Sequence, residues 1–219
     1  MVSHKISQAA IDLIVMEEVS SKAYYEAHYQ HPEWPGGMSG VTIGIGYDCG
    51  YSTRTVIQAD WGDKLPTAMV EALEDVAGIH GSPAESHAHE LRHTVRVPWN
   101  AAMAVFIQRD MPKWEEIVAK ALPNTDKLSP DSFGALVSLA YNRGASFSNK
   151  GARYAEMRAI KDHMSDSQFD HIPDEIRHMK RLWPNVSGLR ARREHEANLF
   201  ERGLTHVSSP AAAATKVSP

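Results

Sequence analysis

The fold is decided by the stretch Val41-Thr42-Ile43-Gly44-Ile45-Gly46-Tyr47, the one part of the chain whose pattern predicts a β-strand. Its β-branched residues alternate with glycines, which allow another part of the backbone to approach closely. The sequence on either side carries helix signals almost throughout. We therefore expect an α+β fold that consists of one helix, a small β-region and then a helical lobe.

The first helix is predicted to be capped by Ser7 and to run to about Ser20, with Ile11, Ile14 and Val15 on one face. We expect a single domain over residues 1–205 and a flexible tail over 206–219. A small β-containing lobe, about 18–60, should face the helical lobe across a cleft, where substrates are commonly held. Further helices are predicted near residues 66–78, 82–95, 100–109, 113–121, 133–142, 153–163, 173–182 and 189–202.

Composition excludes several classes of protein. The 219 residues include 23 basic and 27 acidic side chains, a net charge of −4 that argues against nucleic acid as a partner. A lone cysteine, Cys49, rules out a disulfide framework and a cysteine-based metal cluster. No run of 18 apolar residues suits membrane insertion, and no secretory signal precedes the first helix. We expect a protein that is made in the cytoplasm and is released or delivered by other means.

Three polar residues are placed for acid–base chemistry. Glu18 ends the first helix near its apolar stripe, where partial desolvation would favour the neutral, proton-donating carboxyl group. Thr42 and Asp48 flank the glycine-spaced strand, so that a hydroxyl and a carboxylate can meet one water molecule there. A carboxyl acid on one side of a sugar and a water-positioning group on the other are what glycoside hydrolysis needs.

These residues stand in an order that resembles the active-site region of the phage-type lysozymes, glycoside hydrolase family 24. The similar segments are 18–25 and 39–48, and residues 134–144 and 188–200 resemble the long central helix and the closing helix of that family. In the family, the helix-end Glu is followed seven positions later by a Tyr, here Tyr25, and a hairpin carries the catalytic threonine, here Thr42. The pesticin-like branch is the closest, because its essential aspartate follows the hairpin as Asp48 does.

The resemblance implies a lysozyme-like fold and hydrolysis of the β-1,4 bond between N-acetylmuramic acid and N-acetylglucosamine in peptidoglycan. Glu18 would protonate the glycosidic oxygen while Asp48 and Thr42 orient a water molecule for inversion. We expect a monomer that acts on glycan strands in the periplasm. Two settings stay open, a phage endolysin and a delivered antibacterial effector, and the second would add a delivery apparatus or an immunity protein as a partner.

Some positions depart from the family pattern. Gly36 stands where common phage lysozymes carry an aspartate six residues before the threonine, and Tyr47 stands where they carry a histidine. Glu26 and Glu33 are therefore alternatives to Asp48 as the water-positioning carboxylate, and Glu17 competes with Glu18 as the acid.

Substrate contacts are predicted for Tyr25, Trp34, Tyr47, Asn142 and Arg143. The ring of Trp34 is expected either to stack on a sugar at the edge of the site or to pack against the base of its own loop. Asn142 and Arg143 can reach substrate or cap helix carbonyl groups.

A second motif, His89-Glu90-Leu91-Arg92-His93, matches the H-E-x-x-H pattern of zinc hydrolases. On a helix, however, both histidines would face solvent, opposite an apolar stripe formed by Ala84, Ala88, Leu91 and Val95. We therefore expect neither a metal nor a cofactor, and keep a zinc hydrolase and a non-catalytic wall-binding module as alternative functions. Near the C-terminus, ion pairs on a helix surface are predicted for Arg190, Arg192 and Arg193 with Glu194 and Glu196.

Overall fold

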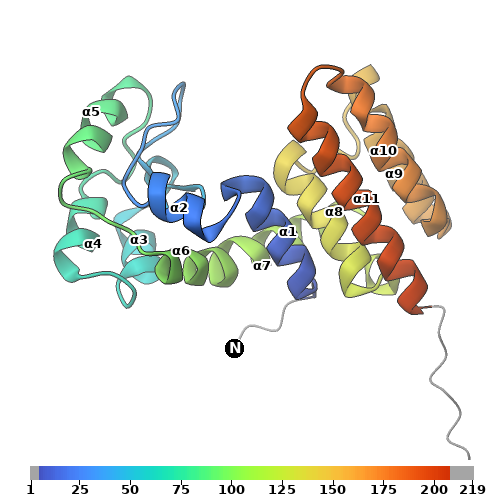
Figure 1. The fold of residues 1–219 in the computed structure, drawn as a ribbon, viewed down its shortest axis with the longest axis horizontal. Coiled ribbons are helices and arrows are strands. Elements are labelled where there is room, and N and C mark those ends of the chain that lie inside the picture. The colour runs from blue at the N-terminus through green and yellow to red at the C-terminus, as the bar shows by residue number, and fades with distance from the viewer. Residues whose placement is uncertain (1–4, 208–219) are drawn as a thin grey trace, which may run out of the picture. The chain divides into compact units, whose positions relative to one another are not determined.

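The computed structural model describes residues 5–207, which form two compact units. One unit comprises residues 14–113 and holds the β-structure, and is thus larger than the lobe predicted at about 18–60. The other comprises the described residues before 14 and after 113. The boundaries fall inside α1 (Gln8–Val19) and α7 (Met111–Ala121), so each of these helices contributes to both units (Figure 1).

The β-structure is an antiparallel hairpin of β1 (Thr42–Ile43) and β2 (Tyr47–Asp48), in which Thr42 pairs with Asp48 and Ile43 with Tyr47. The hairpin that the family resemblance implied is confirmed, whereas residues 41–47 do not form the strand that their alternation predicted, because the glycines form the turn. Gly44 and Gly46 adopt positive φ angles of 60° and 75°, which glycine tolerates and β-branched residues avoid.

The remainder of this unit is helical. Two of its helices, α2 and α3, lie in none of the predicted ranges, because both segments are short. The core of the unit formed by residues 14–113 is built around Tyr25, Tyr47 and Trp61, which are at most 2% exposed. Besides the end of α1, the helices are α2 (Lys22–His28), α3 (Arg54–Trp61), α4 (Thr67–Glu74), α5 (Ser82–Leu91) and α6 (Trp99–Val105), with a 3-10 turn η1 (Cys49–Tyr51) and a π-helical turn η2 (Phe106–Asp110).

The second unit is a helical bundle in which α11 packs against α8 and α10, and α10 packs against α9 (Figure 1). Helix α11 ends at Val207, two residues into the predicted tail, and residues 208–219 lie outside the described part of the chain. The helices that follow α7 are α8 (Pro130–Arg143), α9 (Ala155–Asp166), α10 (Ile172–His178) and α11 (Ser187–Val207), with 3-10 turns η3 (Thr125–Lys127), η4 (Ala152–Tyr154), η5 (Phe169–His171) and η6 (Met179–Leu182).

The charged residues of α11 correct a sequence prediction. Arg192, Arg193 and Glu196 are at most 3% exposed, so they form a buried cluster and not a surface ion pair. Glu196 accepts hydrogen bonds from Arg193 Nη2 at 2.9 Å and from the hydroxyl of Ser138 in α8 at 2.8 Å. The cluster thus joins α11 to α8 through paired charges, and this pairing offsets part of the cost of burying them.

The predicted fold class is confirmed, since the structure is mainly helical with one small antiparallel sheet among the described residues. None of the helices in residues 5–207 has the length and apolar character needed to cross a membrane.

Gly134 provides a test of the packing in the helical unit. A Cβ atom at this position would lie 2.2 Å from the Cβ of Ala10, so α1 and α8 are in contact there. We expect Gly134→Ala to lower the free energy of unfolding by about 2 to 3 kcal/mol, measured by urea denaturation.

Gly188→Ala is the matched control, because a Cβ atom there meets no other atom within 4 Å. This change should leave stability unaltered or raise it by up to about 1 kcal/mol through helix propensity. Equal effects of the two substitutions would contradict the close contact at Gly134.

Candidate active site

Glu18 is positioned by the way α1 ends. Ser20 adopts a left-handed conformation with φ of 62° and donates its N–H to the carbonyl group of Met16 at 2.9 Å, which stops the helix after Val19. Ser21 then caps α2, since its hydroxyl accepts a hydrogen bond from Tyr24 N at 3.1 Å. Glu18 thus lies in the last turn of α1, directly before the turn that leads into α2.

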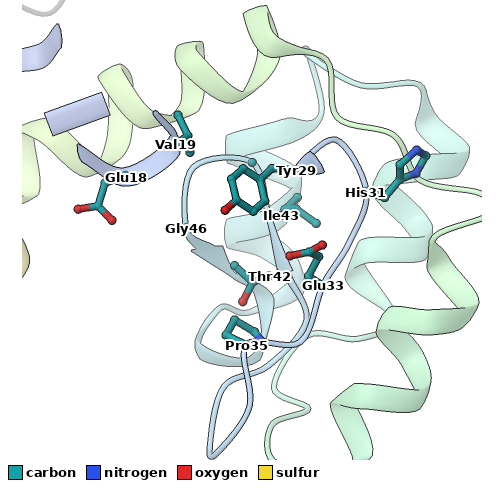
Figure 2. A pocket seen from close by; sticks show the side chains of 10 residues that line it. Glu18, Val19, Tyr29, His31, Glu33, Pro35, Thr42, Ile43 and Gly46 are labelled. Carbon is teal, nitrogen blue, oxygen red and sulfur yellow. The ribbon is translucent and has the colours of Figure 1, made fainter. Parts of the chain in front are cut away.

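Glu18 and Thr42 line one pocket of about 390 Å³ within residues 14–113, which we call the catalytic pocket (Figure 2). The sequence prediction that these two residues lie together therefore agrees with the structure. The remaining residues that line the catalytic pocket come from α1, the 29–35 segment and the hairpin; they are Val19, Tyr29, His31, Glu33, Pro35, Ile43, Gly44 and Gly46.

Glu33 is the second carboxylate in the catalytic pocket. Its backbone pairs with Thr42 in an antiparallel bridge, with Glu33 N to Thr42 O at 2.9 Å and Thr42 N to Glu33 O at 2.8 Å. Residues paired in this way carry their side chains on the same face of the backbone, with Cβ atoms about 5 Å apart. The side chains of Glu33 and Thr42 are thus neighbours on one face, and Figure 2 shows Glu18 on another side of the pocket.

Asp48, the carboxylate predicted to orient the water, is not among the residues that line the catalytic pocket. Its Oδ1 accepts hydrogen bonds from Gly40 N at 3.0 Å and Gly50 N at 2.8 Å, and its Oδ2 accepts from Gly40 N at 3.1 Å. A Cβ atom on Gly40 would lie 2.5 Å from Asp48 Oδ1, so only glycine fits against this carboxylate. In the structure, the carboxylate of Asp48 holds the backbone together at the base of the hairpin.

The environment of Glu18 also differs from the expectation. Its side chain is exposed, so the partial desolvation predicted from the apolar stripe is not found, because the stripe continues through Val19 and not through Glu18. Glu17 is half-buried and is not among the residues that line the catalytic pocket, and Glu26 is likewise absent from it. Of Glu17 and Glu18, the two candidates for the general acid, Glu18 is the one that borders the pocket.

Two of the predicted substrate contacts are corrected. Tyr25 is fully buried, donates its hydroxyl hydrogen to Val97 O at 3.0 Å and packs edge-on against Trp99. Tyr47 is 2% exposed and packs edge-on against Trp61. Both rings therefore belong to the core of the unit.

The other predicted contacts have different outcomes. Trp34 is half-buried, and its indole N–H donates to Ser39 O at 2.9 Å, which fixes the ring. Asn142 and Arg143 belong to the helical unit. There, Asn142 accepts a hydrogen bond from Arg193 at 3.1 Å, and Arg143 donates to the carbonyl group of Arg153 at 2.8 Å. Their role in substrate binding stays a prediction.

The H-E-x-x-H motif lies on the surface, as its spacing indicated. His89 and His93 are exposed, and α5 ends at Leu91, so the two histidines do not share a regular helix. Within residues 5–207, no group of three histidine, cysteine or acidic residues is arranged to hold a metal ion.

A charged network that the sequence did not predict contacts the hairpin at Tyr47. The hydroxyl of Tyr47 donates to Asp60 Oδ2 at 2.9 Å, and Arg109 pairs with Asp60 at 2.8 Å and with Asp110 at 3.0 Å. The guanidinium carbon of Arg109 also lies 4.3 Å from the centre of the Tyr47 ring, a cation–π contact. No sequence signal links these residues, because they come from β2, α3 and the π-helical turn η2.

The comparisons with known proteins identify the family. A profile of the phage lysozyme family matches residues 70–196, which is more than half of the chain. The chain therefore belongs to the phage lysozyme family, which makes it a peptidoglycan-degrading glycoside hydrolase and confirms the resemblance seen in the sequence. No curated protein matches the chain.

The matched range begins after the hairpin, so Glu18, Glu33, Thr42 and Asp48 lie outside it. Their roles rest on the geometry of the catalytic pocket. The closer relationship to the pesticin-like branch stays a prediction.

Asp110 should make the stability of the sheet-bearing unit depend on pH. Burial raises the pKa of its carboxyl group to about 6, and the positive charge of Arg109 offsets only part of that shift. Between pH 4 and 6 the folded chain then binds more protons than the unfolded chain, so this group destabilises the fold as the pH rises through that window. We expect Asp110→Asn to gain about 2 kcal/mol of stability relative to wild type between pH 4.5 and 7.5, measured by urea denaturation at both values.

Asp63→Asn is the control, because Asp63 is exposed and its pKa is lowered by Lys64, which moves its titration below this window. The difference between this variant and wild type should not change between the two pH values. A pH-independent difference for Asp110→Asn would contradict a buried carboxyl group that titrates near pH 6.

Proposed function

We propose that the protein hydrolyses the β-1,4 bond between N-acetylmuramic acid and N-acetylglucosamine, with Glu18 as the general acid. The observation that carries the proposal is the catalytic pocket, which is lined by Glu18 and, on another side, by the neighbouring residues Glu33 and Thr42. Glu18 donates its proton to the glycosidic oxygen, and the leaving sugar departs as an alcohol. The carboxylate of Glu33 and the hydroxyl of Thr42 hold a water molecule that attacks the anomeric carbon from the opposite side, and the carboxylate of Glu33 takes up the proton that this water molecule loses.

In this scheme Glu33 takes the water-positioning role, while Asp48 supports it from the base of the hairpin. Asp48 ties Gly40 and Gly50 together, and Thr42 lies between them in sequence and pairs with Asp48 across the hairpin. An aspartate that follows the hairpin can thus be essential for activity without touching the substrate. Because the water attacks opposite the leaving group, the product should have an inverted anomeric configuration.

The setting in which the enzyme acts is also proposed. Its substrate lies outside the cytoplasmic membrane, so the chain should act on the wall in the periplasm after release or delivery. A pocket that forms within one unit of the chain is consistent with a monomer. The choice between an endolysin and a delivered effector with an immunity partner stays open.

Glu18→Gln tests the acid. The substitution removes the transferable proton but keeps the size of the side chain, so the rate should fall by about 100-fold or more. The measurement is the release of reducing ends from purified peptidoglycan, with mass spectrometry of the products to identify the bond that is cut. NMR of the first-formed anomer reports inversion or retention.

Glu17→Gln is the matched control, because Glu17 is the adjacent carboxyl group on the same turn of α1 and lies outside the lining of the pocket. It should keep the wild-type rate. Loss of activity in Glu17→Gln alone would reassign the acid, and wall binding without release of reducing ends by wild type would indicate a binding module.

Glu33→Gln and Asp48→Ala distinguish the proposed catalytic role of Glu33 from the structural role of Asp48. Glu33→Gln should lower the rate by about 100-fold and leave the melting temperature unchanged, since Glu33 is partly exposed and supports no backbone group with its carboxylate. Asp48→Ala leaves the buried N–H groups of Gly40 and Gly50 without their acceptor, so the free energy of unfolding should fall by about 2 kcal/mol together with activity. The reverse pattern would return the water-positioning role to Asp48.

A further inference from the structure

A second pocket adjoins the catalytic pocket, and Glu33 lines both of them. This α5 pocket has a volume of about 350 Å³ and lies between the 32–34 segment and helix α5. Buried Pro32 and Ala88 form its apolar base, and Trp34 contributes an aromatic ring that is held in place by its hydrogen bond to Ser39. A molecule bound next to Glu33 can therefore extend from one pocket into the other.

Arg92 provides the α5 pocket with a guanidinium group that can bind an anion. Residues 14–113 contain four arginines, and Arg54, Arg96 and Arg109 each donate hydrogen bonds to a side chain. The guanidinium group of Arg92 donates none to any residue in the described part of the chain; it approaches Glu33 Oε1 only to 3.9 Å and is 48% exposed. Its planar set of N–H donors is available for a carboxylate, which guanidinium groups bind in a bidentate manner.

The remaining polar groups of the α5 pocket are Glu85 and His89, both exposed on α5. With Arg92 they form a lining of mixed charge over an apolar base. Such a lining fits a short peptide that carries both free carboxylates and a free amine better than it fits a neutral sugar, whose hydroxyl groups require no ionic partner.

We propose that the α5 pocket binds the peptide stem of the same N-acetylmuramic acid whose bond is cleaved, and that Arg92 binds a carboxylate of that stem. This inference rests on the proposed function. The stem leaves the sugar ring through its lactyl group, so a ring held beside Glu33 and Thr42 brings its peptide to the neighbouring pocket. Arg92 is then a specificity residue that favours glycan strands with peptides over bare strands.

The test measures binding to the Glu18→Gln protein, which removes the proposed acid but keeps both pockets. Its two ligands are a disaccharide that carries its peptide and the same disaccharide after removal of the peptide by an amidase. Isothermal titration calorimetry should show that the peptide-bearing ligand binds about tenfold more tightly. Adding Arg92→Gln should abolish that preference and leave the affinity for the bare disaccharide unchanged.

Two further variants sharpen the result. Arg92→Lys keeps the charge but loses the planar donor pair, so it should retain part of the preference. Arg54→Gln is the matched control, because Arg54 is an exposed arginine of the same unit whose hydrogen bond goes to Asp75. It should bind both ligands as the parent protein does.

Several outcomes would overturn the inference. A preference that survives in Arg92→Gln places the peptide elsewhere, and an equal loss for both ligands makes the α5 pocket a sugar subsite. Absence of binding to either ligand also overturns it. The readout needs no turnover, so a protein that releases no reducing ends but shows the Arg92-dependent preference contradicts the proposed function alone.

Discussion

The carboxylate of Asp48 holds together the part of the molecule on which the candidate site depends. It accepts hydrogen bonds from Gly40 and Gly50, two backbone positions ten residues apart that enclose the hairpin. The packing is tight enough that neither glycine has room for a side chain. With these ends tied, Thr42 is held in the bridge to Glu33, and the pair can present a hydroxyl and a carboxylate at one wall of the pocket.

A second group of contacts stabilises the hairpin through Tyr47. The ring of Tyr47 packs edge-on against Trp61 and also contacts the guanidinium group of Arg109. Two aspartates form ion pairs with that guanidinium group. The π-helical turn η2 supplies both Arg109 and Asp110, and such turns often occur where a helix must aim particular side chains. The short hairpin, which would be marginally stable by itself, thus gains a rigid base from residues distant in sequence.

Several features of the fold could be predicted because they depend on neighbours in sequence. The period of Ile11, Ile14 and Val15 predicts α1, and the alternation of β-branched residues with glycine predicts the β-region. Other predictions failed where a tertiary partner decided the outcome. Arg192, Arg193 and Glu196 have the spacing of a surface ion pair but are buried, because Ser138 and Asn142 of α8 supply the hydrogen bonds that make burial possible.

The sequence by itself determined the family and the helical character of the chain, and it predicted Glu18 and Thr42 as candidate site residues, since each of these follows from local patterns and their order. Only the tertiary structure shows which carboxylate lies at the same pocket. Glu33 and Asp48 are both acidic residues near the hairpin, and local sequence does not distinguish them. The bridge to Thr42 brings Glu33 to the pocket, while the N–H groups of Gly40 and Gly50 engage Asp48, because a carboxylate is directed by the donors that surround it in space.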